Sequence, residues 1–149
     1  MQTFLPYKSF LFSAKCLDKR RLFKQLIEAR QILATLGEDV RKIDGSKYKA
    51  THKNHPAVKM WKGYEAALQN YHNEIWNECK LRGINVSRIN KLNKLYQVQK
   101  WPKWLGNKYL HQSHQSNLVR KAPNHYRKYF PVVPDDLEYI WPQGAFNVR

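Results

Sequence analysis

The sequence predicts an all-α protein, with one compact domain over residues 1–149, three main helices and an irregular C-terminal arm. Three stretches repeat apolar residues at intervals of three and four, which is the period of an amphipathic helix. Alternation of apolar and polar residues, the pattern of a half-buried strand, is scarce. Prolines recur after residue 122, and proline disfavours a further long helix.

The first helix is expected from about Ser13 to Leu36. Ser13 is a favourable N-cap, and Gly37 suits the position just past a helix end. The stripe expected to face the core comprises Leu22, Leu26, Ala29, Leu33 and Leu36. The polar stretch from Gly37 to Asn54 predicts a loop.

The second helix is expected from about Pro56 to Arg82. Proline is favoured at the first position of a helix, and Gly83 suits the position past its end. The apolar stripe of this helix comprises Trp61, Tyr64, Leu68, Tyr71, Ile75 and Cys79. A short basic helix is expected next, from Ser87 as its cap to about Tyr96.

The third helix is expected from about Asn107 to Lys121, and Pro123 closes it. The remaining residues are expected to form the irregular arm, because prolines interrupt them repeatedly. The aromatic residues expected to anchor this arm to the body are Tyr126, Tyr129, Phe130, Tyr139 and Trp141.

The net charge is the first clue to a partner. Lys and Arg number 27 against 11 Asp and Glu, which gives a formal charge of +16. An excess of this size repels itself unless a polyanion meets it, and nucleic acid is the commonest such partner. The alternative is a basic soluble protein without such a partner.

No apolar run reaches the ~18 residues of a membrane span. Cys16 and Cys79 are too few for a disulfide scaffold, which favours a cytoplasmic protein.

One acid stands within a cationic strip of the first helix. At ~100° per residue, the side opposite the apolar stripe carries Arg21, Lys24, Glu28 and Gln31, with Arg20 beside them. One interpretation is a solvated face on which Glu28 pairs with Lys24, although Lys before Glu is the weaker order. The other is that the carboxylate does chemistry on a nucleic acid bound by the strip.

Several segments, taken in order along nearly the whole chain, carry a family resemblance. They are Met1–Tyr7, Leu22–Glu28, Met60-Trp61, Glu78–Val86, His111–Ser113, Arg120–Pro123, Tyr126–Tyr129 and Pro134–Pro142. Together they resemble the pyrimidine-dimer DNA glycosylases of the phage endonuclease V type. The first and last segments are similar to a bacterial and viral branch of that family.

The resemblance implies a mainly helical, metal-free and cofactor-free enzyme that acts as a monomer on damaged double-stranded DNA, in a bacterium or a virus-infected cell. It implies displacement of a nucleotide, cleavage of the glycosidic bond and a nick by β-elimination. The N-terminal α-amine would form an imine with C1′ of the sugar, and Glu28 would act in both steps. An α-amine has an ordinary pKa of ~7.7–8.0, so part of it is neutral at pH 7. Imine formation gives covalent catalysis without a cofactor.

The second residue departs from the family pattern. Gln2 is too bulky for ordinary removal of the initiator, so Met1 is expected to stay and to supply the amine. Gln2 would then take the place of a basic residue that contacts DNA. Ile27 and Gln31 stand where the phage enzyme has arginines, and the cations expected to compensate are Arg20, Arg21 and Lys24.

Further DNA-binding residues are expected outside the first helix. His55 is a site candidate, with a helix cap or a packed imidazole as the alternative. His111 and His114 share a helix face, where phosphate or base contact competes with structural packing and, weakly, with a metal site. Cations interleaved with aromatics suit a DNA-contacting arm, whose predicted contacts are Arg120, Lys121, Tyr126, Arg127 and Lys128.

Two other functions stay open from the sequence. One is a non-catalytic nucleic-acid-binding protein on the same scaffold. The other is a glycosylase for a different damaged or modified base.

Overall fold

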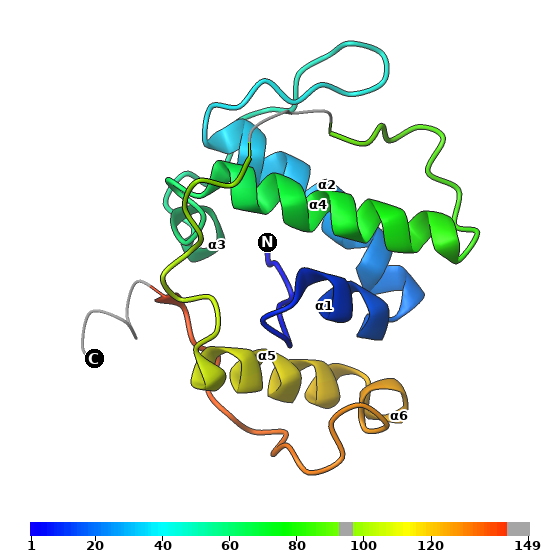
Figure 1. The fold of residues 1–149 in the computed structure, drawn as a ribbon, viewed down its shortest axis with the longest axis vertical. Helices are drawn as coiled ribbons and strands as arrows, with labels where there is room; N and C mark the ends of the chain where they lie inside the picture. The colour runs from blue at the N-terminus through cyan, green and yellow to red at the C-terminus, as the bar shows by residue number, and fades with distance from the viewer. Residues whose placement is uncertain (93–96, 143–149) are drawn as a thin grey trace.

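The computed structural model describes residues 1–92 and 97–142, and helices dominate it (Figure 1). They are α1 (Phe10–Cys16), α2 (Lys19–Thr35), α3 (Pro56–Lys59), α4 (Glu65–Leu81), α5 (Lys108–Lys121) and α6 (Pro123–Tyr126). Within the described residues the only β pairing is one isolated bridge, between Arg41 and Lys47. The all-α prediction is confirmed. None of the described helices is long and apolar enough to span a membrane.

The first predicted helix is in fact two helices, α1 and α2. Helix α1 begins at Phe10, where Ser9 Oγ accepts from Phe12 N at 3.1 Å, so Ser13 is not the N-cap. The chain turns at Asp18, which has extended backbone angles and caps α2 by accepting from Arg21 N at 3.4 Å. A capping carboxylate satisfies amide groups that the start of a helix leaves unpaired, so the break at this point is stable.

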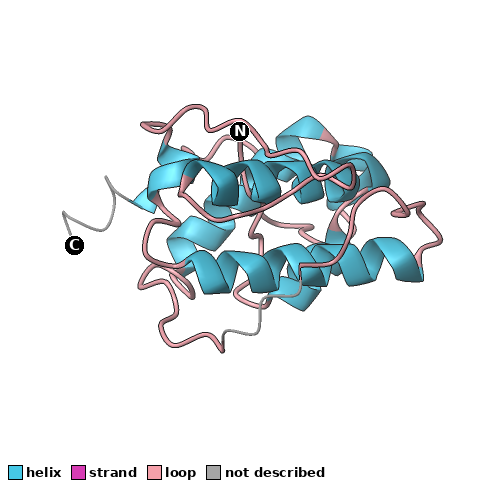
Figure 2. Cartoon of the chain, turned by 90° about the horizontal axis from the view of Figure 1, so that it is seen from above, coloured by secondary structure: helices cyan, strands magenta, loops and turns pink. Residues whose placement is uncertain are grey.

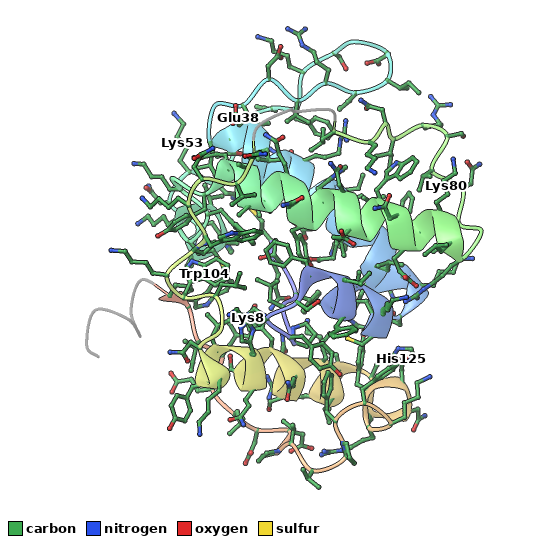
Figure 3. All side chains as sticks on the ribbon, viewed as in Figure 1. Lys8, Glu38, Lys53, Lys80, Trp104 and His125 are labelled. Carbon is green, nitrogen blue, oxygen red and sulfur yellow. The ribbon has the colours of Figure 1, made fainter. Side chains whose placement is uncertain are left out.

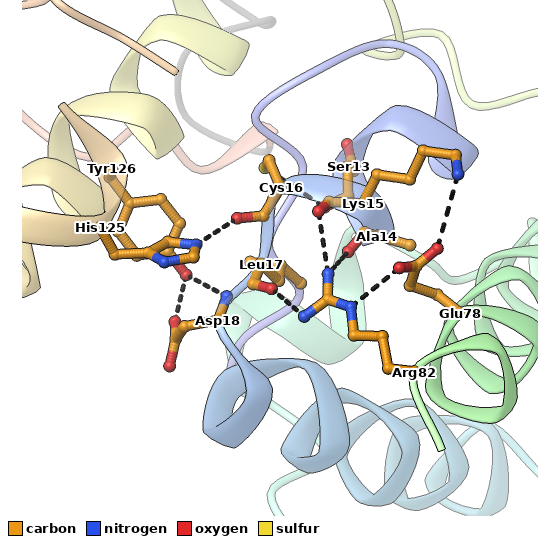
Figure 4. Close-up of polar contacts among 10 residues, drawn as sticks. All are labelled: Ser13, Ala14, Lys15, Cys16, Leu17, Asp18, Glu78, Arg82, His125 and Tyr126. Atoms are coloured by element: carbon orange, nitrogen blue, oxygen red, sulfur yellow. Dashed lines mark hydrogen bonds and ion pairs between the residues drawn. The ribbon is translucent and has the colours of Figure 1, made fainter. Parts of the chain in front are cut away.

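The turn at Leu17 and Asp18, called the elbow below, joins α1 to α2. Residues at the end of α4 hold it by hydrogen bonds (Figure 4). Arg82 donates to Glu78 Oε2 at 2.8 Å. Its two terminal nitrogens donate to carbonyls at the end of α1, those of Leu17 at 2.7 Å, Ala14 at 3.2 Å and Lys15 at 2.8 Å. The guanidinium thus supplies donors at the end of α1, where a helix leaves backbone carbonyls without helical partners.

Helix α6 meets the same elbow from the other side. The Tyr126 hydroxyl accepts from Asp18 N at 3.0 Å and donates to the Asp18 carboxylate. Burial alone would raise the pKa of Asp18, but hydrogen bonds from Tyr126 and Arg21 hold it below its ordinary value. The first turn of α2 is therefore fixed beside α6.

The second predicted helix is also interrupted. Helix α3 ends at Lys59, and α4 begins only at Glu65, after a turn in which Gly63 has φ of 85°. That angle is strained for other residues, so the turn depends on glycine. The basic helix expected from Ser87 is wrong over residues 87–92, which form a turn followed by irregular chain. Its last residues, 93–96, lie outside the described part.

The third predicted helix is confirmed as α5, with Asn107 as its N-cap. The arm after it begins with the single turn of α6 and is otherwise irregular.

The core lies mainly between α2 and α4, and α1 also packs on α4. Figure 2 shows the helices and the long loops between them from above. The predicted stripes face this core. The fully buried members are Leu22, Leu26, Ala29, Leu33, Trp61, Leu68, Tyr71, Ile75 and Cys79. Only Leu36 and Tyr64 remain partly exposed. The two cysteines are free and buried.

Candidate active site

The N-terminal segment crosses the middle of the protein, with α4 on one side and α5 on the other (Figure 1). Helix α2 holds it through Gln25, whose Oε1 accepts from Phe4 N at 2.9 Å and whose Nε2 donates to Gln2 O at 3.1 Å. Helix α4 adds Tyr71, whose hydroxyl contacts Gln25 Oε1 at 2.7 Å and Phe4 O at 2.8 Å. The position of the first residues is therefore set by buried hydrogen bonds.

Helix α5 holds the same segment from the other side. His114 Nδ1 accepts from Leu5 N at 2.9 Å, and His111 Nδ1 donates to Leu5 O at 2.7 Å. Gln115 donates to Pro6 O at 2.7 Å. Each of these bonds joins residues more than 100 positions apart in the sequence.

Three of the predicted DNA contacts lie inside the fold. His111 is 6% exposed, His114 is 1% exposed and Tyr126 is fully buried. Such burial is incompatible with direct contact to DNA. For the two histidines the structural alternative holds, since they position the N-terminal segment, and Tyr126 joins α6 to the elbow.

The folded protein is expected to lose stability in mild acid, because two of its histidines are buried. Burial lowers the pKa of His114 to about 3 and that of His72 to about 4. The unfolded chain binds these protons near pH 6.5, so stability is complete above that pH and falls as the pH drops towards 4. The expected loss at pH 5 is about 2 kcal/mol for each histidine.

Thermal unfolding followed by circular dichroism at pH 7.5 and pH 5 measures this effect. His114→Asn keeps an acceptor for Leu5 N but does not titrate, so the variant should lose less stability between the two pH values. An unchanged wild-type midpoint at pH 5 would contradict the assignment.

Gln25 offers a direct test of how the N-terminal segment is held. Gln25→Leu leaves Phe4 N and Gln2 O without their partners, which should cost about 2–4 kcal/mol of stability. It should also lower catalysis, because the first residues lose their fixed position. Gln112→Leu on the exposed face of α5 is the matched control and should change neither unfolding nor rate. Equal effects of the two substitutions would contradict this role for Gln25.

Met1, Glu28 and His55 lie in one neighbourhood. Burial lowers the pKa of His55, the positive charges of the N-terminus and His52 lower it further, and the negative charge of Glu28 opposes them. His55 Nδ1 accepts from Ala57 N at 3.0 Å and caps α3, so the neutral ring carries its proton on Nε2. The helix-cap alternative for His55 is thus correct, and the same residue borders the N-terminus.

Glu28 is a partly exposed carboxylate on α2. Among the residues that the structure describes, no ion pair or hydrogen bond occupies it, and exposed Lys24 does not pair with it. The interpretation of Glu28 as half of a surface ion pair is therefore not supported. An unpaired carboxylate near the N-terminal amine is available to a substrate.

The other residues of α2 that were predicted to contact DNA divide into two groups. Arg20 and Lys24 are exposed, whereas Arg21 pairs with Asp18 at 3.1 Å. Gln31 donates to Lys49 O and to Thr51 Oγ1, and so holds the loop that leads to His55. The DNA contact predicted for Gln31 stays a prediction beside this structural role.

The cations of the arm divide in the same way. Arg120 donates to Asp135 O at 2.6 Å, and Arg127 donates to Phe130 O at 3.2 Å. Lys121 and Lys128 are exposed. Figure 3 shows Lys53 and Lys80 on opposite sides of the molecule, so positive charge also lies outside α2 and the arm.

Sequence reasoning missed Gln25 and the anchoring role of α5. Gln25 is a polar residue inside the apolar stripe of α2, next to Leu26, and that position was the available signal. His52 was also missed; its φ of 58° is uncommon outside glycine, and its charge acts on His55.

Two hollows of the surface lie away from this neighbourhood. One of about 740 Å³ is lined by residues of α1 and α4 and by Trp101, and one of about 520 Å³ lies beside Arg30. Neither includes Met1, Glu28 or His55. The described residues contain no group of three or more metal-ligating side chains.

A protein-family model described as "Pyrimidine dimer DNA glycosylase" matches residues 1–92. This range contains the N-terminal segment, Glu28 and His55, and excludes α5, α6 and the arm. No curated protein and no solved structure matches the chain.

Proposed function

This chain belongs to the pyrimidine dimer DNA glycosylase family, and we propose that it excises ultraviolet pyrimidine dimers and then nicks the abasic strand. Met1 is the proposed nucleophile and Glu28 the proposed acid–base residue. One observation supports this assignment: the charges of the N-terminus and of Glu28 both act on His55, so the amine and this unpaired carboxylate share one neighbourhood.

The proposed glycosylase step exchanges one bond at C1′ for another. The neutral α-amine of Met1 attacks C1′, and the glycosidic bond breaks with its electron pair passing to the base. The ionised Glu28 stabilises the positive charge that develops on the sugar. The attached nitrogen then gives up its two protons, one to the departed base and one to O4′ as the C1′–O4′ bond breaks, and this leaves an imine between the nitrogen and C1′.

The proposed lyase step uses the same two groups. The imine acidifies the proton on C2′, and Glu28 accepts it. The C3′–O bond then breaks, and the phosphate leaves with the electron pair. Water finally hydrolyses the imine and restores the free amine.

Exposed cations at one end of the molecule are proposed to bind the DNA backbone. Arg20 and Lys24 belong to α2, while Lys121 and Lys128 lie near α6. Because Tyr126 bonds to Asp18, α6 and the start of α2 lie at one end of the molecule. Phosphate contacts of this kind make the affinity fall steeply with salt.

The test of the function is cleavage of a panel of duplexes that differ at one position. The panel contains a cyclobutane dimer, an abasic site, an oxidised base, an alkylated base and an undamaged control. Cleavage at the dimer and at the abasic site is expected, without cleavage of the undamaged duplex. Binding without any cleavage would favour the non-catalytic alternative. Cleavage at another damaged base but not at the dimer would reassign the substrate.

A further inference from the structure

The turn formed by residues 51–55 is held against the face of α2 that carries Glu28. Gln31, one helical turn after Glu28, donates to Thr51 Oγ1 at 3.3 Å. Thr35, one turn further along, accepts from Thr51 N at 3.2 Å. Residues three and four apart in a helix share a face, so these two bonds fix the start of the turn on the Glu28 side of α2.

The other end of the turn is fixed as well, and the residue between the two ends is strained. His55 N donates to His52 O at 2.9 Å, and His55 itself caps α3. Between these anchors His52 has φ of 58°, a left-handed angle that residues other than glycine adopt at a cost in free energy. Glycine would take the same angle without that cost.

The imidazole of His52 makes no contact that would offset this strain. It is exposed, and within the described part of the chain it makes no hydrogen bond, ion pair or ring contact. The charges of His52, the N-terminus and Glu28 all act on His55, so the ring lies at the edge of the candidate active site. A strained residue whose side chain does not support its own fold indicates a role towards a partner outside the fold.

We infer that His52 binds a DNA phosphate next to the sugar that the Met1 amine attacks. The inference rests on the proposed glycosylase function, which brings the phosphates on both sides of that sugar to the candidate site. An imidazole donates a ring N–H to a phosphate oxygen in its neutral and in its charged form. Phosphate contacts fix the register of a protein on DNA, so this contact would set which sugar faces Met1.

Replacement of His52 by glycine separates this role from a structural one. His52→Gly removes the strain, so the unfolding midpoint should equal that of wild type or rise. The affinity for a duplex with a tetrahydrofuran abasic analogue, which cannot form an imine, should fall about 10-fold. His52→Asn also favours the left-handed conformation and should lose the same affinity without loosening the turn. A residue kept only for the fold would lose stability and leave the affinity unchanged.

Neutral phosphates identify the contact directly. A methylphosphonate replaces one phosphate at a time, over the positions on either side of the analogue. At the phosphate that His52 binds, this replacement should weaken wild type about 10-fold more than it weakens either variant, because the variants have already lost the contact. At the other phosphates the effects of the two changes should add, which makes those positions the matched control.

Additive losses at every phosphate, or a glycine variant that binds as wild type does, would overturn the inference. Failure of wild type to cleave both the dimer and the abasic duplex would instead overturn the proposed function. The binding measurements involve no cleavage, so the two failures are distinguishable.

Discussion

A tag fused before Met1 is expected to abolish cleavage of both the dimer and the abasic duplex, with a loss of about 10³-fold or more. The fusion converts the α-amine into an amide, which cannot form an imine. The N-terminal segment cannot shift to place another amine at the site, because buried hydrogen bonds hold Phe4 and Leu5 to three helices. DNA binding should survive, since the exposed cations are untouched.

The matched control is the same fusion after a protease has removed the tag and restored the native first residue. It should regain full cleavage in the same assay, with rates measured under single-turnover conditions. A tagged protein that cleaves as fast as the restored one would remove the N-terminal amine from the mechanism.

Replacement of Glu28 by Gln is expected to separate binding from chemistry. The side chain keeps its size and loses its charge, and no described partner is lost because the carboxylate makes no ion pair or hydrogen bond. Removal of a general acid–base group should lower single-turnover cleavage by about 10²–10⁴-fold. The affinity for DNA should stay unchanged or increase, because a negative charge leaves a cationic surface.

Glu74→Gln provides the control for charge alone. Glu74 is also a partly exposed carboxylate within a helix, α4, and it lines the hollow that contains Trp101. Its replacement should leave the cleavage rate within about twofold of wild type. If Glu28→Gln cleaves normally, or if the two variants lose activity equally, the role of Glu28 is wrong.

The helices were predictable from the sequence because their apolar stripes repeat with the helical period. The two interruptions were not: the apolar stripe of the second predicted helix continues across the turn at Gly63, and the stripe of the first begins only after Asp18 and so does not report on the break. Asp18 as a cap and Gly63 with its positive φ decide those breaks locally. Periodicity alone cannot weigh a cap against a continued helix.

The candidate site was predictable only in part. Glu28 stood out because it is an acid among cations, and the importance of Met1 came from the family resemblance. The means of positioning Met1 could not be predicted, because Leu5 and its partner His114 are 109 positions apart. The same long-range packing buries His111 and His114, which were expected to contact DNA and instead support the N-terminal segment.

The most direct test of the central claim is to locate the covalent bond to DNA. The native protein is mixed with an abasic duplex, reduced with borohydride, treated with nuclease and digested with trypsin. Tandem mass spectrometry should place the sugar remnant on the α-amine of the peptide Met1–Lys8, with cleavage after Lys8 intact. A remnant on a lysine side chain, or no covalent adduct at all, would contradict the account.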